Sequence, residues 1–165
     1  MTFNSTIGDE AANSYISVEQ ADNYHEGRLH NSEWVNANTA TKQASLRMAT
    51  AYLENMPWKG FRSTTEQSLA WPRSDVAAVD GREIADDVIP RMLINATAEL
   101  AWELLRRDRF VDSDSAGIKA VKAGAVEVEF DRMTEPNSLP VYVLDMLKHL
   151  MARGWGTAFA SIERA

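Results

Sequence analysis

The chain contains no cysteine, which excludes disulfide bridges and metal sites built on thiolates. It also has no apolar run near the roughly 18 residues that a membrane-spanning helix needs. Its N-terminus lacks the charged and apolar regions of a secretory signal peptide. From these absences we expect a protein that folds in a reducing cytoplasm.

Motifs that carry chemistry are also missing. The sequence has no glycine-rich phosphate loop, no nucleophile elbow and no Cys–His pair. Asp22 and Glu26 flank His25 on a predicted helix, but no set of residues has metal-ligand spacing, and His30 falls at the wrong angle. We interpret His25 as a surface histidine. The sequence therefore predicts neither enzymatic activity nor a metal or cofactor.

The 165 residues that are present suffice for one domain with a proper core, and 45% of them are hydrophobic. The net charge is −7, distributed unevenly: residues 1–40 carry −5, residues 41–73 carry +3 and residues 74–165 carry −5. An acidic protein is a poor general binder of nucleic acid. The basic middle segment can meet an acidic partner or the acidic segments of a neighbouring copy.

One stretch, residues 56–73, combines two tryptophans with three cations between two helical patterns. Proline and glycine prevent a continuous helix there. The first interpretation is a loop pinned to the helices by its buried indoles. The second is a cation-plus-aromatic surface for single-stranded nucleic acid, whose contacts would be Trp58, Lys59, Arg62, Trp71 and Arg73.

Helical periodicity predicts a mainly helical (α+β) domain, a small bundle of about four main helices. Ser17 opens the first helix with a capping box completed by Gln20, and its apolar face extends to Leu29. The next two are expected over residues 41–55 and 90–108, with Pro90 in a first turn. A last helix begins near Ser138 and Pro140 and ends at Gly154.

The pattern changes period between the last two helices, where Val126, Val128 and Phe130 alternate with Glu127 and Glu129. This predicts a β-hairpin over residues 118–130. A lone hairpin is marginal in water, so we expect it to pack on the helices or pair with another chain. The predicted subunit-interface residues are Lys122, Glu127, Glu129 and Phe130.

Both ends of the chain lack periodicity. We predict an extended N-terminal arm over residues 1–14, a single domain over residues 15–154 and a C-terminal arm over residues 155–165. The C-terminal arm either packs on its own domain or docks on a partner. Its candidate partner-binding residues are Trp155, Phe159 and Ile162.

Five stretches carry a resemblance to a known family: residues 14–22, 58–62, 70–73, 89–90 and 122–130. They resemble small tailed-bacteriophage proteins that are often labelled DnaT-like single-stranded-DNA-binding proteins and that look like head–tail connectors, or adaptors. The resemblance covers roughly residues 14–150, and the two tryptophan blocks are its most specific part. It implies a mainly helical subunit with a small hairpin.

The resemblance also implies a function. Such subunits form a ring, usually twelve-fold, beneath the portal protein in the virion neck, after assembly in the host cytoplasm. The ring would contact tail or head-completion proteins, and double-stranded DNA would pass through its lumen. Our main hypothesis is therefore a structural head–tail connector whose C-terminal arm binds the portal. A single-stranded-DNA-binding module is the alternative, and a generic helical interaction domain is a third.

Overall fold

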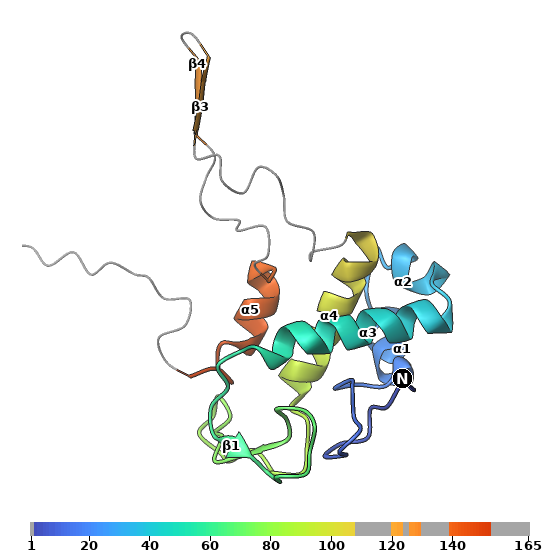
Figure 1. The fold of residues 1–165 in the computed structure, drawn as a ribbon, viewed down its shortest axis with the longest axis vertical. Helices are drawn as coiled ribbons and strands as arrows, with labels where there is room; N and C mark the ends of the chain where they lie inside the picture. The colour runs from blue at the N-terminus through green and yellow to red at the C-terminus, as the bar shows by residue number, and fades with distance from the viewer. Residues whose placement is uncertain (1, 108–119, 124–125, 130–138, 153–165) are drawn as a thin grey trace, which may run out of the picture.

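The computed structural model describes residues 2–107, 120–123, 126–129 and 139–152. Within these residues the chain is mainly helical, as predicted (Figure 1). The helices are α1 (Val18–Glu26), α2 (Ser32–Asn36), α3 (Thr39–Glu54), α4 (Arg91–Arg106) and α5 (Val141–Leu147). Two antiparallel pairs of short strands accompany them: β1 (Phe61–Arg62) with β2 (Arg73–Ser74), and β3 (Ala120–Ala123) with β4 (Val126–Glu129).

Local sequence signals set the starts of the helices. The Ser17 side chain accepts a hydrogen bond from the Gln20 backbone, and the Gln20 side chain accepts one from the Ser17 backbone, which confirms the predicted capping box. Asn38 caps α3 in a similar way by accepting from the Thr41 backbone at 2.9 Å. Pro90 stands at the N-cap of α4, where its missing N–H leaves no helical bond unmade.

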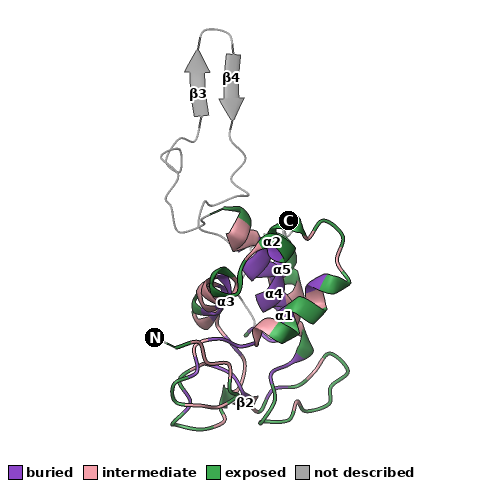
Figure 2. Cartoon of the chain, turned by 90° about the vertical axis from the view of Figure 1, so that its right-hand side faces the viewer, coloured by how far each residue is buried: buried purple, intermediate pink, exposed green. Residues whose placement is uncertain are grey.

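Helices α3 and α4 form the centre of the domain, and α1, α2 and α5 pack against α4. Fully buried leucines and alanines line the contact between the two central helices, and Figure 2 shows the buried surface concentrated on α4. Each buried leucine contributes roughly 1.5–3 kcal/mol relative to an exposed one. The core leucines of this contact are Leu46, Leu53, Leu93 and Leu100.

The hairpin predicted for residues 118–130 is confirmed in its backbone. Strands β3 and β4 pair antiparallel, with Lys122 opposite Glu127 and Ala120 opposite Glu129. Within the described residues, β3 and β4 mainly contact each other. Phe130 and the C-terminal residues Trp155, Phe159 and Ile162 lie outside the described residues, so their predicted interface roles stay predictions.

Residues 2–14 contain no helix or strand, as predicted, but they do not form a free arm. The Asn4 backbone carbonyl accepts from the Asn13 and Ser14 backbone N–H groups at 2.8 and 3.1 Å. Ser68 then ties the segment to the body, because its hydroxyl donates to the Ala12 carbonyl at 2.6 Å. Backbone groups of this segment therefore find partners in their own chain.

Leu29 departs from the predicted apolar face of α1. Gly27 forms the C-cap of that helix, so Leu29 lies beyond it and is 82% exposed.

In the described part of the chain, no helix is both long and apolar enough to cross a membrane.

Candidate nucleic-acid interface

The basic loop of residues 56–73, which we call the tryptophan loop, is anchored to the residues that follow α5. Trp58 forms an isolated β-bridge with Met151, and the Lys59 backbone N–H donates to the Leu150 carbonyl at 2.9 Å. Trp58 and Trp71 are 8% and 1% exposed and meet edge to face, with ring centroids 5.8 Å apart. Their predicted burial is confirmed, and it leaves almost no ring surface on which a base could stack.

Strands β1 and β2 bring the two halves of the loop together. Phe61 lies opposite Ser74, and Arg62 lies opposite Arg73. The approach requires glycine at position 60, which has a φ of +67°. A Cβ atom there would overlap the Ser74 carbonyl oxygen and lie 2.7 Å from Val76 Cγ2. The backbone of Gly60 can therefore approach β2 only because it carries no side chain.

Arg73 serves the loop's own backbone. Its guanidinium donates to the carbonyls of Lys59 at 2.6 Å, Ala70 at 3.1 Å and Gly60 at 2.5 Å. Burial lowers the pKa of this half-buried guanidinium from its usual value. Three of its five N–H donors bond these carbonyls, so Arg73 ties the strands together, and its half-buried position makes it a poorer phosphate contact than the exposed Arg62.

Two polar residues that the sequence did not single out organise the same loop. Gln67 is 2% exposed; its amide donates to the Leu69 and Pro72 carbonyls at 2.8 and 3.0 Å, and its oxygen accepts from the Thr64 backbone. Glu54, the last residue of α3, accepts from the Ala70 backbone at 2.9 Å and from the Tyr15 hydroxyl. The sequence gives no sign that Gln67 and Glu54 organise the loop, because this role depends on their hydrogen-bond partners in the folded chain.

The remaining residues of the predicted nucleic-acid set, Lys59 and Arg62, differ in how strongly they are hydrogen-bonded within the chain. Lys59 donates from Nζ to the His149 carbonyl at 2.8 Å. Arg62 is exposed, and its hydrogen bond to the Gln67 carbonyl is long, at 3.4 Å. Beside it Phe61 is 70% exposed, although the sequence offered no reason to choose it. We call Phe61 and Arg62 the β1 edge. It places an exposed aromatic ring next to a cation whose hydrogen bond to its own chain is long.

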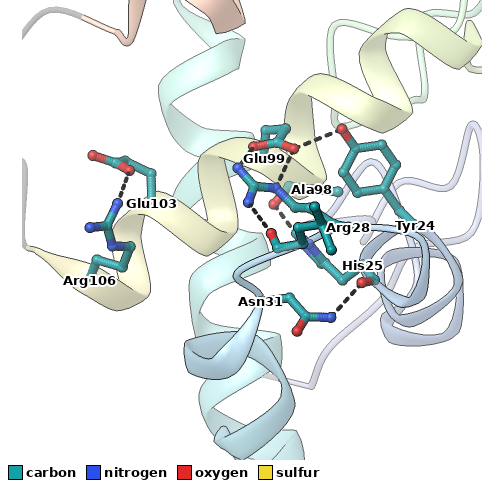
Figure 3. A network of polar contacts seen from close by, with 9 residues as sticks. Tyr24, His25, Arg28, Asn31, Ala98, Glu99, Glu103 and Arg106 are labelled. Atoms are coloured by element: carbon teal, nitrogen blue, oxygen red, sulfur yellow. Dashed lines mark hydrogen bonds and ion pairs between the residues drawn. The ribbon is translucent and has the colours of Figure 1, made fainter.

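A second group of cations and aromatics joins α1 to α4 (Figure 3). Arg28 makes a two-armed ion pair with Glu99, with Nε–Oε1 and Nη2–Oε2 distances of 2.8 and 3.0 Å, and its guanidinium lies 3.9 Å from the Trp102 ring centroid. Tyr24 donates to Glu99 at 2.8 Å. Burial alone would raise the pKa of Glu99, but the hydrogen bonds from Arg28 and Tyr24 and the charge of Arg28 outweigh it and lower the pKa.

His25 belongs to this junction, which corrects its interpretation as a surface histidine. It is 1% exposed, stacks on Trp34 with ring centroids 4.6 Å apart, and bonds the Ala98 carbonyl through Nε2 at 3.1 Å. Burial lowers the pKa of its imidazole. Ala21 and His25 are both buried on α1, and the bond from His25 to α4 is a tertiary contact that the charges flanking His25 do not indicate.

The geometry thus divides the predicted nucleic-acid set. Trp58, Trp71 and Arg73 lie inside the tryptophan loop, whereas Arg62 lies on its surface with Phe61, and Lys59 is partly exposed. Within the described ranges, no group of three or more histidine or acidic side chains is arranged to hold a metal ion.

Comparison with protein families finds a match over the whole chain. The family described as "Putative DnaT-like ssDNA binding protein" matches residues 1–165. No curated protein and no solved structure matches the chain. The label that the sequence resemblance suggested is confirmed, while the connector role stays a prediction. The match spans the whole sequence, so the chain belongs to the family of DnaT-like single-stranded-DNA-binding proteins.

Proposed function

We propose that the protein binds single-stranded DNA through the β1 edge, with Lys59 beside it. The observation that carries the proposal is the pairing of an exposed Phe61 ring with the exposed, lightly bonded guanidinium of Arg62. Both stand in the chain's net-positive segment, and the family's description names the same ligand. A base would stack on Phe61, and the neighbouring phosphate would meet Arg62.

The energetics limit such a site to weak binding. Stacking of one base on an aromatic ring contributes about 1–3 kcal/mol. One or two phosphate contacts add an electrostatic part that salt screens. The net charge of −7 opposes any broader contact with a polyanion. We therefore expect a dissociation constant well above the nanomolar range at physiological salt.

Fluorescence anisotropy of a labelled oligothymidylate tests the proposal. Phe61→Ala and Arg62→Gln should each weaken binding by about fivefold or more, because each removes one of the two contacts. Val79→Ala and Arg82→Gln are the matched controls, since Val79 is 66% exposed and Arg82 is an exposed arginine outside the tryptophan loop. Equal loss in the controls, or no loss at the β1 edge, contradicts the proposal.

A structural head–tail connector is the second candidate. It is favoured by the acidic net charge together with the burial of both loop tryptophans, since both features oppose strong DNA binding. In this function, subunits would form a ring, predicted to be twelve-fold, between the portal and tail proteins. The ring would pass double-stranded DNA through its lumen without sequence-specific contact, and the protein would catalyse no reaction.

Deletion of residues 155–165 tests the connector function. We expect the truncated protein to keep its fold, with a melting temperature shifted by only a few degrees, and to lose co-sedimentation with portal-bearing capsids. Electron microscopy of the full chain with portal should show rings. Full occupancy of capsids by the truncated protein would mean that this arm does not dock on the portal.

A further inference from the structure

The residues that follow α5 run beside the part of the tryptophan loop that leads into β1 (Figure 1). Their contacts are the Trp58–Met151 bridge, the bond from the Lys59 backbone to Leu150, and a bond from the Ala152 backbone N–H to the Pro57 carbonyl at 2.7 Å. The bridge is antiparallel, and Lys59 precedes Phe61 by two residues. The residues after α5 therefore border the proposed single-stranded-DNA site.

His149 is an exposed residue of this segment and lies next to a cation. The Lys59 Nζ donates to the carbonyl of His149 at 2.8 Å, so the ammonium group lies beside this residue. The bond uses one of the three N–H donors of the ammonium group. An exposed aromatic residue with a cation beside it is also the arrangement of Phe61 and Arg62 at the β1 edge. The structure thus places two such pairs near each other.

The carboxylate closest to His149 along the chain is already paired. Asp145 lies 2.7 Å from Lys148 Nζ. The hydrogen bond from Lys148, and then the charge of Lys148, lower the pKa of the Asp145 carboxyl, and His149 adds a smaller contribution. All three residues are exposed, so solvent and salt screen their charges. Asp145 is therefore a weak obstacle to a phosphate at Lys59.

The other two histidines differ from His149 in exposure or in place. His25 is 1% exposed and stacks on Trp34. His30 is exposed, but it stands just before α2, whereas β1 follows the far end of α3. The 16 residues of α3 span about 24 Å, and Figure 1 shows α2 beside one end of this helix and β1 beyond the other. His149 is thus the histidine that can share a ligand with the β1 edge, and His30 is its natural control.

We propose that His149 is a second base-stacking position of the single-stranded-DNA site. The inference rests on the proposed function and extends it, because the strand then runs from Phe61 past Lys59 to His149. Histidine and phenylalanine rings both stack on unpaired bases, and Lys59 meets the phosphate between the two bases. Stacking uses the faces of the bases, which all bases share, so the extended site binds single strands without regard to sequence.

Fluorescence anisotropy of a labelled oligothymidylate tests this position with three variants at exposed sites, where substitution is expected to leave the fold intact. His149→Asn removes the ring and should weaken binding about fivefold or more. His149→Phe keeps a ring and should bind within about twofold of the wild type. His30→Asn is the matched control and should bind like the wild type. Asparagine suits that position because His30 has a φ of +56°.

Proton NMR of the histidine rings reads the contact directly. Addition of an unlabelled oligodeoxyadenylate should shift the His149 ring protons upfield, through the ring current of the stacked base, and leave those of His30 in place. The inference is overturned if the His149 protons do not move, if His149→Phe binds as weakly as His149→Asn, or if His30→Asn loses as much. In each case a loss at Phe61→Ala leaves the proposed function standing with one stacking position. If neither Phe61→Ala nor His149→Asn weakens binding, the proposed function fails as well.

Discussion

Two half-buried arginines hold segments of this domain together, and they are bound in different ways. In the tryptophan loop, Arg73 donates to three backbone carbonyls. At the α1–α4 junction, Arg28 lies over Trp102 and pairs with the carboxylate of Glu99. Arg73 links segments of backbone, and its carbonyl partners do not titrate. Arg28 forms an ion pair with Glu99, so this contact requires both side chains to be charged. In both places the arginine stabilises the fold of its own chain.

Within the tryptophan loop, the buried residues that hold the structure differ from the exposed residues that are available to a ligand. The sequence offers tryptophans and cations as one set, but its buried members hold the loop together. Phe61 and Arg62 can meet a ligand because their own chain leaves them largely exposed. The predictions below test that division, beginning with the interior of the loop.

Trp71→Ala should have the largest effect on stability. The side chain is 1% exposed and packs edge to face on Trp58. Its removal should lower the free energy of unfolding by about 3–5 kcal/mol, as for other buried aromatic residues. Chemical denaturation measures the change. A loss below about 1 kcal/mol would show that the tryptophan does not hold the loop.

Arg28→Gln should come next, because it leaves Glu99 buried without its partner. Breaking a buried ion pair costs about 3–5 kcal/mol, and the partial exposure of Arg28 places the cost at or below the lower end. Arg91→Gln is the matched control, since Arg91 is exposed on α4. Denaturation of both variants at pH 7 gives the difference, and equal stability would contradict the account of the junction.

Acid should destabilise the junction before it affects the tryptophan loop. Burial lowers the pKa of His25, so the unfolded chain, with its ordinary pKa of 6.5, binds the proton more readily. Stability should therefore fall as the pH drops below about 6.5 toward the lowered value. The lowered pKa of Glu99 adds a further loss below its usual 4.5. His25→Gln should flatten the upper part of this pH profile in thermal unfolding; an unchanged slope would rule out His25.

Phe61→Ala should have the smallest effect on stability, within about 0.5 kcal/mol, because the ring is mostly in solvent. Thermal unfolding next to Trp71→Ala compares edge and interior directly. A loss of several kcal/mol at Phe61 would mean that the β1 edge is part of the core and that the proposed division is wrong.

Much of the fold was predictable because its signals are local. Ser17 and Gln20 are three residues apart, Pro90 marks the start of α4, and the hairpin shows in the alternation of Val126 to Glu129. The site was harder, because its contacts join distant residues. The pairing of Phe61 with Ser74, the burial of Gln67 and the contact of His25 with Ala98 have no local pattern. Composition drew attention to the loop but could not tell Lys59 and Arg73, which bond backbone carbonyls at short distances, from the more weakly bonded Arg62.

The salt dependence of oligonucleotide affinity tests the central claim most directly. If Arg62 contacts a phosphate and Arg73 does not, Arg62→Gln should make the slope of log affinity against log salt shallower by about 0.7, the contribution of one phosphate on a single strand. Arg82→Gln should leave the slope as in the wild type. A slope that is the same in wild type and Arg62→Gln would contradict the assignment of the β1 edge as the nucleic-acid contact.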